Sequence, residues 1–303
     1  MDGKELLYRL RHLLNEDSNS AFLDSKTAYT YLWDAVTKFV ERTNYSQSNE
    51  TITTVADQST YDLSADFLKP YLMDDDNRLF LHYNDGSDNH IIYWRDYHQI
   101  RSQNTTTSVS IPTGWAIIDE AAIDSRISGT ATSDGAASAG ECNLTDTAAD
   151  FSGVEAGDTV HNVTDGSDGV VLSVTSSTVL VTALFGGTNN DWSTSDSYVV
   201  RPQAKLALVL DPPPESGGHT ITLGKIQRPA PVFSNYGAYR VQSRAIPAIL
   251  HYAAWLFKYR DSSPDTGDRF YQFFDSEVRQ LGNQINISKN RGGFTMNMKK
   301  RRN

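Results

Sequence analysis

The chain has 303 residues, enough for two domains of ordinary size, and its single cysteine, Cys142, excludes an intramolecular disulfide and a cysteine-rich zinc site. Six of its 27 basic residues lie after residue 288, where there is no acid, so the rest of the chain has 21 basic against 37 acidic residues. That body carries a formal charge of −16 within a total of −10, which argues against a protein that wraps nucleic acid.

The N-terminal region predicts two amphipathic helices. Residues 4–14 carry leucines at helical spacing, and no signal-like apolar stretch precedes them. Asp24 or Ser25 is expected to cap a second helix that runs to about Thr43, and the two helices should form a hairpin. No apolar run approaches the ~20 residues that span a bilayer. We therefore expect synthesis and function in a reducing cytoplasm, or in a particle assembled there.

From Thr51 the period of the sequence changes to two, which predicts short strands. The pattern Asn84-Asp85-Gly86 indicates a hairpin turn between two of them. The predicted elements of this region are strands over residues 52–55, 59–63, 79–83, 91–94 and 114–118, and a short helix over 95–101.

Residues 127–200 form a stretch of 74 residues without Lys or Arg, rich in Gly, Ser, Thr and Val. About six short strands within it predict a small β-barrel or sandwich. Strands over residues 205–210 and 220–226 follow, and joining Ile118 to Leu206 gives one antiparallel unit. This predicts a domain inserted at the tip of a hairpin, where interruption is tolerated.

Two further helices are expected at the C-terminal end, over residues 248–259 after Pro247 and over residues 268–285. The fold class predicted is α+β: a helical bundle built from the N- and C-terminal helix pairs, with a central antiparallel β segment and an inserted all-β domain. The predicted domains are a core of residues 1–126 and 201–288, an insert of residues 127–200, and a flexible basic arm of residues 289–303.

Motifs of the common catalytic classes are absent: there is no phosphate-binding loop, no Gly-x-Ser-x-Gly elbow and no His-Glu-x-x-His. We therefore expect a protein that is not an enzyme, with no catalytic residue, metal or cofactor. Two groups of residues are possible metal sites, and the alternatives for them are solvated turns and ordinary packing. One group is His82, His90 and His98, and the other, for Ca²⁺, is the set of acidic turns at Asp158, Asp165 and Asp168.

The composition of the basic arm is compatible either with a solubilising tail or with an interaction segment. Phe294, Met296 and Met298 alternate with its polar residues and favour docking on a partner, because a solubilising tail has no use for apolar anchors.

Three stretches carry a resemblance to a known family. They are Leu208-Val209-Leu210-Asp211-Pro212-Pro213-Pro214, then Ile221-Thr222-Leu223-Gly224-Lys225-Ile226-Gln227-Arg228-Pro229-Ala230-Pro231, then Ile246-Pro247-Ala248-Ile249-Leu250-His251-Tyr252-Ala253-Ala254-Trp255-Leu256-Phe257-Lys258. In this order, between two helix pairs, they resemble the head-to-tail adaptor (connector) proteins of tailed bacteriophages. The resemblance covers residues 1–126 and 201–288; the insert and the arm are not parts of a minimal adaptor.

The resemblance implies a structural virion protein at the head–tail junction, assembled in the host cytoplasm, that forms a ring, commonly of twelve subunits. The ring would join the portal protein to tail nozzle or fibre proteins and let DNA pass without specific binding. The resemblance also implies that the arm reaches the portal, through residues of both apolar and basic character: Phe294, Met296, Met298, Lys299, Lys300, Arg301 and Arg302.

Two alternatives stay open. One is a tail-associated glycan-binding or peptidoglycan-degrading protein, with the β insert as a glycan module and acidic residues as a catalytic pair, although no carboxylate pair stands out. The other is a nucleic-acid-binding module that uses the basic arm.

Overall fold

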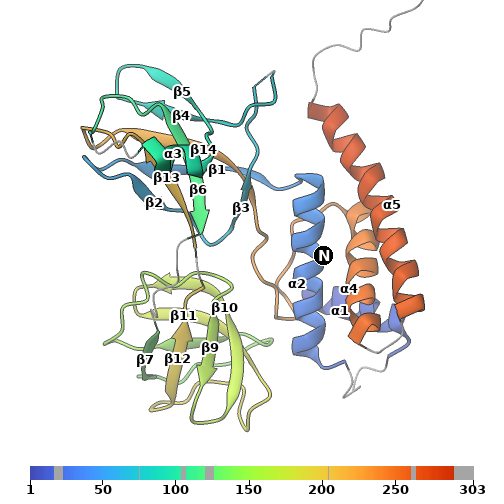
Figure 1. Cartoon of the computed structure of the whole chain (residues 1–303). Coiled ribbons are helices and arrows are strands. Elements are labelled where there is room, and N and C mark those ends of the chain that lie inside the picture. The colour runs from blue at the N-terminus through green and yellow to red at the C-terminus, as the bar shows by residue number, and fades with distance from the viewer. Residues whose placement is uncertain are drawn as a thin grey trace, which may run out of the picture.

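The structure is a computed structural model that describes residues 1–16, 23–74, 76–103, 107–119, 126–203, 205–260 and 264–289. In Figure 1, helices α2 (Ser25–Thr43), α4 (Ile246–Arg260) and α5 (Pro264–Lys289) run side by side at one side of the molecule, and the β-sheets lie at the other side. The segment between β14 (Thr220–Gln227) and α4 runs from the sheets back to the helices.

The predicted α+β fold, organised by a helical bundle, is wrong. In the described part of the chain, most of the elements are strands: fourteen of them form three antiparallel sheets, beside only five α-helices. The physical reason is that the hydrophobic pattern of a helix is easier to detect in a sequence than that of a short strand. A leucine stripe over three helical turns is a strong pattern, whereas a strand of three to five residues carries few side chains on each face. The prediction therefore gave the helices too much weight.

The first two helices begin with side-chain caps and end at a left-handed asparagine. The carboxylate of Asp2 accepts a hydrogen bond from the Glu5 amide, and that of Asp24 from the Thr27 amide, each at 2.8 Å. Asn15 and Asn44 follow the two helices in the left-handed region, and the second helix ends at Thr43, where the sequence predicted its end. The helices are α1 (Gly3–Leu14), α2 (Ser25–Thr43), α3 (Tyr97–Gln103), α4 (Ile246–Arg260) and α5 (Pro264–Lys289).

Helix α4 contacts α1, α2 and α5, so it lies at the centre of the helical group. It is apolar on several sides, in keeping with this position, and buries Ile249, Ala253 and Phe257 completely. On α5, Phe274 and Val278 lie in the same core.

Two sheets share a second core around Tyr83 and Trp115, both fully buried. The first sheet has five strands: β1 (Gln47–Thr53), β14 (Thr220–Gln227), β4 (Phe80–Asn84) and β5 (Asn89–Tyr93) in that order, with β3 (Phe67–Pro70) also paired to β14. The second has three strands in the order β2 (Thr60–Asp62), β13 (Leu206–Asp211) and β6 (Gly114–Asp119).

The third sheet is built entirely from strands between residues 127 and 201, around a core that contains Phe151, Trp192 and Tyr198. Its order is β7 (Ile127–Thr130), β12 (Ser197–Arg201), β9 (Thr159–Asn162), β10 (Ser167–Ser176), β11 (Val179–Phe185) and β8 (Cys142–Thr145). The strands on either side of it pair as the sequence predicted, with Ile118 opposite Ala207 in an antiparallel register. The division of the chain into a core, an inserted domain and an arm stays a prediction.

Candidate functional site: an aromatic surface and a bridging segment

The seven residues predicted to contact a portal lie outside the described residues. They are Phe294, Met296, Met298, Lys299, Lys300, Arg301 and Arg302. The candidate site is therefore built from two features of the described chain, the outer side of α4 and α5 and the segment that joins β14 to α4.

Aromatic rings extend from the helical core to the solvent across α4 and α5. The Tyr252 ring lies 4.8 Å from that of the buried Phe274 and 5.0 Å from that of Trp255, measured between ring centroids. Trp255 in turn lies 5.1 Å from Tyr271 and 5.3 Å from Tyr259. Such tilted and edge-on pairs stabilise one another beyond the burial of area alone.

Two rings on these helices are largely open to solvent. Tyr259 is 55% exposed and Phe273 is 53% exposed, and the Phe273 ring lies 5.3 Å from that of His251. We define the aromatic surface as two groups of rings outside the core of α4 and α5: Tyr252, Trp255, Tyr259 and Tyr271 in one, and His251 and Phe273 in the other. Exposed aromatic rings are typical of protein contact sites.

The sequence held a signal for this surface. Tyr252, Trp255 and Tyr259 are three and four residues apart, which places them on one face of a helix. The sequence alone could not show whether that face is covered by another element, because this depends on how α5 packs against α4.

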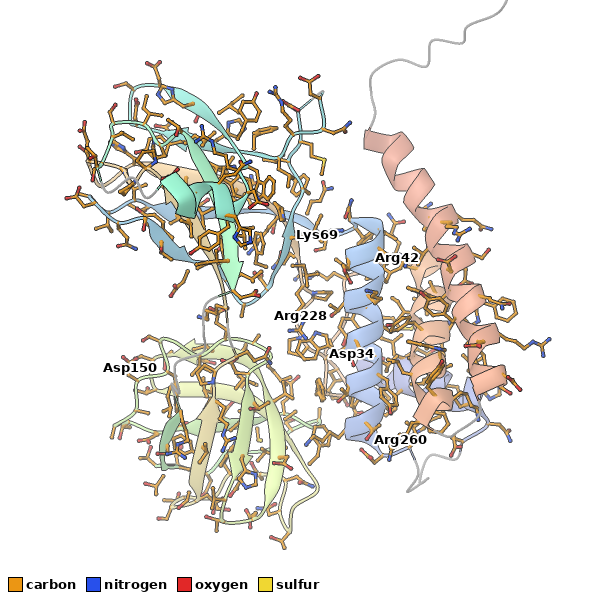
Figure 2. All side chains as sticks on the ribbon, viewed as in Figure 1. Asp34, Arg42, Lys69, Asp150, Arg228 and Arg260 are labelled. Carbon is orange, nitrogen blue, oxygen red and sulfur yellow. The ribbon has the colours of Figure 1, made fainter. Side chains whose placement is uncertain are left out.

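The second feature is the bridging segment, which we define as residues 228–242. It begins directly after β14 and crosses to the helices. Trp33 of α2 donates its indole N–H to the Pro229 carbonyl at 2.9 Å, and the Arg228 guanidinium lies 3.9 Å from the centre of the same indole. Figure 2 shows Arg228 and Asp34 on the side of α2 that faces the sheets.

Phe233 is the central contact of the bridging segment. Its ring lies 6.0 Å from that of Tyr29, 6.2 Å from that of Trp33 and 6.1 Å from that of Phe185 on β11. The Asn235 amide also donates to the Ala139 carbonyl at 3.0 Å. The bridging segment therefore joins α2 to the third sheet.

The third sheet also approaches α2 directly. Gly157 has a φ of +102°, and a Cβ there would lie 2.9 Å from the Trp33 ring. Glycine is therefore required at this position both for its backbone conformation and for the close contact.

A buried ionic cluster fixes the edge of the first sheet. Lys225 of β14 donates to the carboxylates of Glu50 and Asp66, the latter at 2.6 Å, and to the Ser64 hydroxyl at 2.6 Å. Burial opposes the charge on Lys225, but the hydrogen bonds to Asp66 and Glu50 outweigh it, and the pKa of Lys225 is raised. Each carboxylate of the cluster contacts the lysine, so we interpret it as a structural group.

Side chains from both of the metal sites that the sequence offered have other partners. His90 contacts Asp85 at 3.0 Å, and Asp168 contacts His161 at 2.8 Å. The Asp158 carboxylate accepts hydrogen bonds from the amides of Glu155 and Gln203. Within the described ranges, no group of three or more His, Cys, Asp or Glu side chains is arranged to hold a metal ion. None of the helices in those ranges is long and apolar enough to cross a membrane.

The aromatic surface and the bridging segment are thus contact features. No protein-family model and no curated protein sequence matches the chain.

Proposed function

We propose that this chain is a structural subunit of a virion, which forms a ring between the capsid portal and the tail and leaves a channel for the genome. Its partners would be other copies of itself, the portal protein, and tail nozzle or fibre proteins. The observation that carries the proposal is the aromatic surface, because half-exposed Tyr259 and Phe273 next to a packed ring cluster are suited to burial against another protein.

The charge of the chain also supports the proposal. A body with 37 acidic and 21 basic residues repels phosphate, which suits a channel that must let DNA slide through. The contacts of the bridging segment also favour a structural role for the protein. They join the helices to a sheet whose strands are distant from the helices in the sequence.

Replacing Phe273 and Tyr259 together by aspartate should weaken ring formation by more than tenfold, because two aromatic contacts of the proposed interface would become charged. The unmodified protein, mixed with the portal protein of the same virus, should give rings in electron micrographs and a multiple of the subunit mass. The control is Tyr236→Asp, at a position 77% exposed in the bridging segment and outside the aromatic surface. Normal rings from the double variant would contradict this use of the surface, and a monomer that hydrolyses peptidoglycan would favour the alternative function.

Deleting residues 289–303 should abolish attachment to the portal and leave the circular dichroism spectrum unchanged, because the arm supplies six cations and three apolar anchors. Cosedimentation with portal rings measures this. A second variant changes four basic residues to glutamine, Lys299, Lys300, Arg301 and Arg302. It retains the apolar anchors, so it separates their contribution to portal attachment from the contribution of charge. Attachment that survives the deletion would show that the arm does not dock.

A further inference from the structure

A cavity of about 410 Å³ lies between the C-terminal end of α2, the start of β1 and the bridging segment. Its volume falls within the range of small-molecule sites, roughly 300–1,000 Å³. The lining combines two arginines and two tyrosines with aliphatic walls, supplied by Arg228, Arg240, Tyr45, Tyr239, Val40 and Val241.

Arg228 is the first cationic group of the lining. Its Nε is buried and has no hydrogen-bond partner, and the guanidinium makes no ion pair within 4.0 Å in the part of the chain that the structure describes. Its ring contact with Trp33 holds the guanidinium plane in place. A buried donor without an acceptor costs free energy, so the guanidinium that lines the cavity is left under-satisfied.

Arg240 is the second cationic group. It is exposed at the same cavity, and no side chain in the described ranges pairs with it. Between the two arginines, Tyr239 is 4% exposed, and burial raises the pKa of its hydroxyl, which therefore stays protonated. The cavity lining thus carries two guanidiniums in a chain of net charge −10.

We propose that this cavity binds a small organic carboxylate with an apolar or aromatic body. The planar fork of an arginine matches a carboxylate in two parallel hydrogen bonds. Asp34 is the acidic group that acts on Arg228, so the two arginines and this aspartate leave a net charge of one positive unit. That charge balances a monoanion and leaves a phosphate dianion uncompensated. Val40, Val241 and the Tyr45 ring supply the walls for the body of the ligand.

A second cavity, between the start of α2 and the third sheet, is a weaker candidate. Lys26, His161 and Arg201 line it, but Asp168 lies among them. The Asp168 carboxylate contacts His161 at 2.8 Å and Lys26 at 3.9 Å. Two of its three nitrogen bases are thus already paired.

The test is calorimetric titration of the full chain at pH 7 with 3-phenylpropionate, its neutral amide and phenyl phosphate. The acid should bind and the amide should not. Arg240→Gln should weaken binding of the acid about tenfold, the loss expected for one charge-assisted hydrogen bond. Arg228→Lys, which keeps the charge and removes the fork, should weaken it similarly. The control is Arg269→Gln on α5, an exposed arginine outside the cavity, and it should leave the affinity unchanged.

The proposal is overturned if the acid does not bind, if its amide binds equally well, if phenyl phosphate binds more tightly, or if Arg240→Gln has no effect. A short peptide that ends in phenylalanine with a free carboxylate identifies the source of the ligand. Tighter binding of this peptide than of the free acid assigns the cavity to a protein terminus, and weaker binding assigns it to a free acid. These titrations use the isolated chain, so their outcome is independent of portal attachment.

Discussion

Replacing Phe233 by alanine should lower the free energy of unfolding by about 3–5 kcal/mol, the range for loss of a buried phenylalanine. The side chain is 2% exposed, and its ring contacts rings from α2 and from β11. Its removal leaves a cavity where two parts of the molecule meet, and the surroundings of such a cavity relax only in part.

Urea denaturation monitored by circular dichroism measures this loss. The control is Phe273→Ala, since that side chain is 53% exposed and its truncation should change the free energy of unfolding by about 0.5 kcal/mol or less. A loss below about 1 kcal/mol for Phe233→Ala would show that the bridging segment does not hold α2 and the third sheet together.

Replacing Lys225 by methionine should cost about 3–5 kcal/mol, because the carboxylates of Glu50 and Asp66 would lose their cation inside the sheet. The Lys225 side chain is only 8% exposed, so water cannot replace the lost partner. The matched control is the triple variant with Glu50→Gln and Asp66→Asn added. It removes the orphaned charges and should recover most of the lost stability. A triple variant no more stable than the single one would contradict an electrostatic origin.

The cost of Lys225→Met should depend on pH at both ends of the scale. Burial opposes the ionisation of Asp66, but hydrogen bonds from Lys225 and Ser64 outweigh it and hold its pKa below 3.8. Its stabilisation is thus complete above about pH 4 and is lost as the pH falls through the folded value. The pKa of Lys225 is raised above 10.5, so its stabilisation is complete below that pH and is lost as the pH rises through the folded value. The difference between the two proteins should therefore be largest between about pH 5 and 10.

Local elements could be predicted from the sequence where a pattern is confined to neighbouring residues. The cap at Asp24 fixed the start of α2, and the turn at Asn84-Asp85-Gly86 placed the β4–β5 hairpin to within two residues. The start of β1 was missed, because residues 47–50 are all polar and become a strand only by pairing with β14, more than 170 residues later. No local pattern reports such a pairing.

The balance between helices and strands, and the positions of the candidate sites, were harder to predict for the same reason. The leucine stripe of α1 can be recognised from its helical period alone. The core around Trp115, in contrast, contains side chains from strands that precede the third sheet in the sequence and from strands that follow it. The cavity at Arg228 and Arg240 was not predicted, because it depends on the path of the bridging segment past α2. The Lys225 cluster likewise joins residues from β14 to residues about 160–175 positions earlier.

Two attachments of the third sheet to the rest of the chain differ in kind. One is covalent, at the adjacent ends of β6 and β13, where Asp119 lies opposite Leu206. The other is the contact of Phe185 with Phe233 and, through it, with α2. A tensile or bending force applied to this sheet can thus reach the helices without first passing through the five-stranded sheet. The load would be shared between the covalent chain and contacts between aromatic rings.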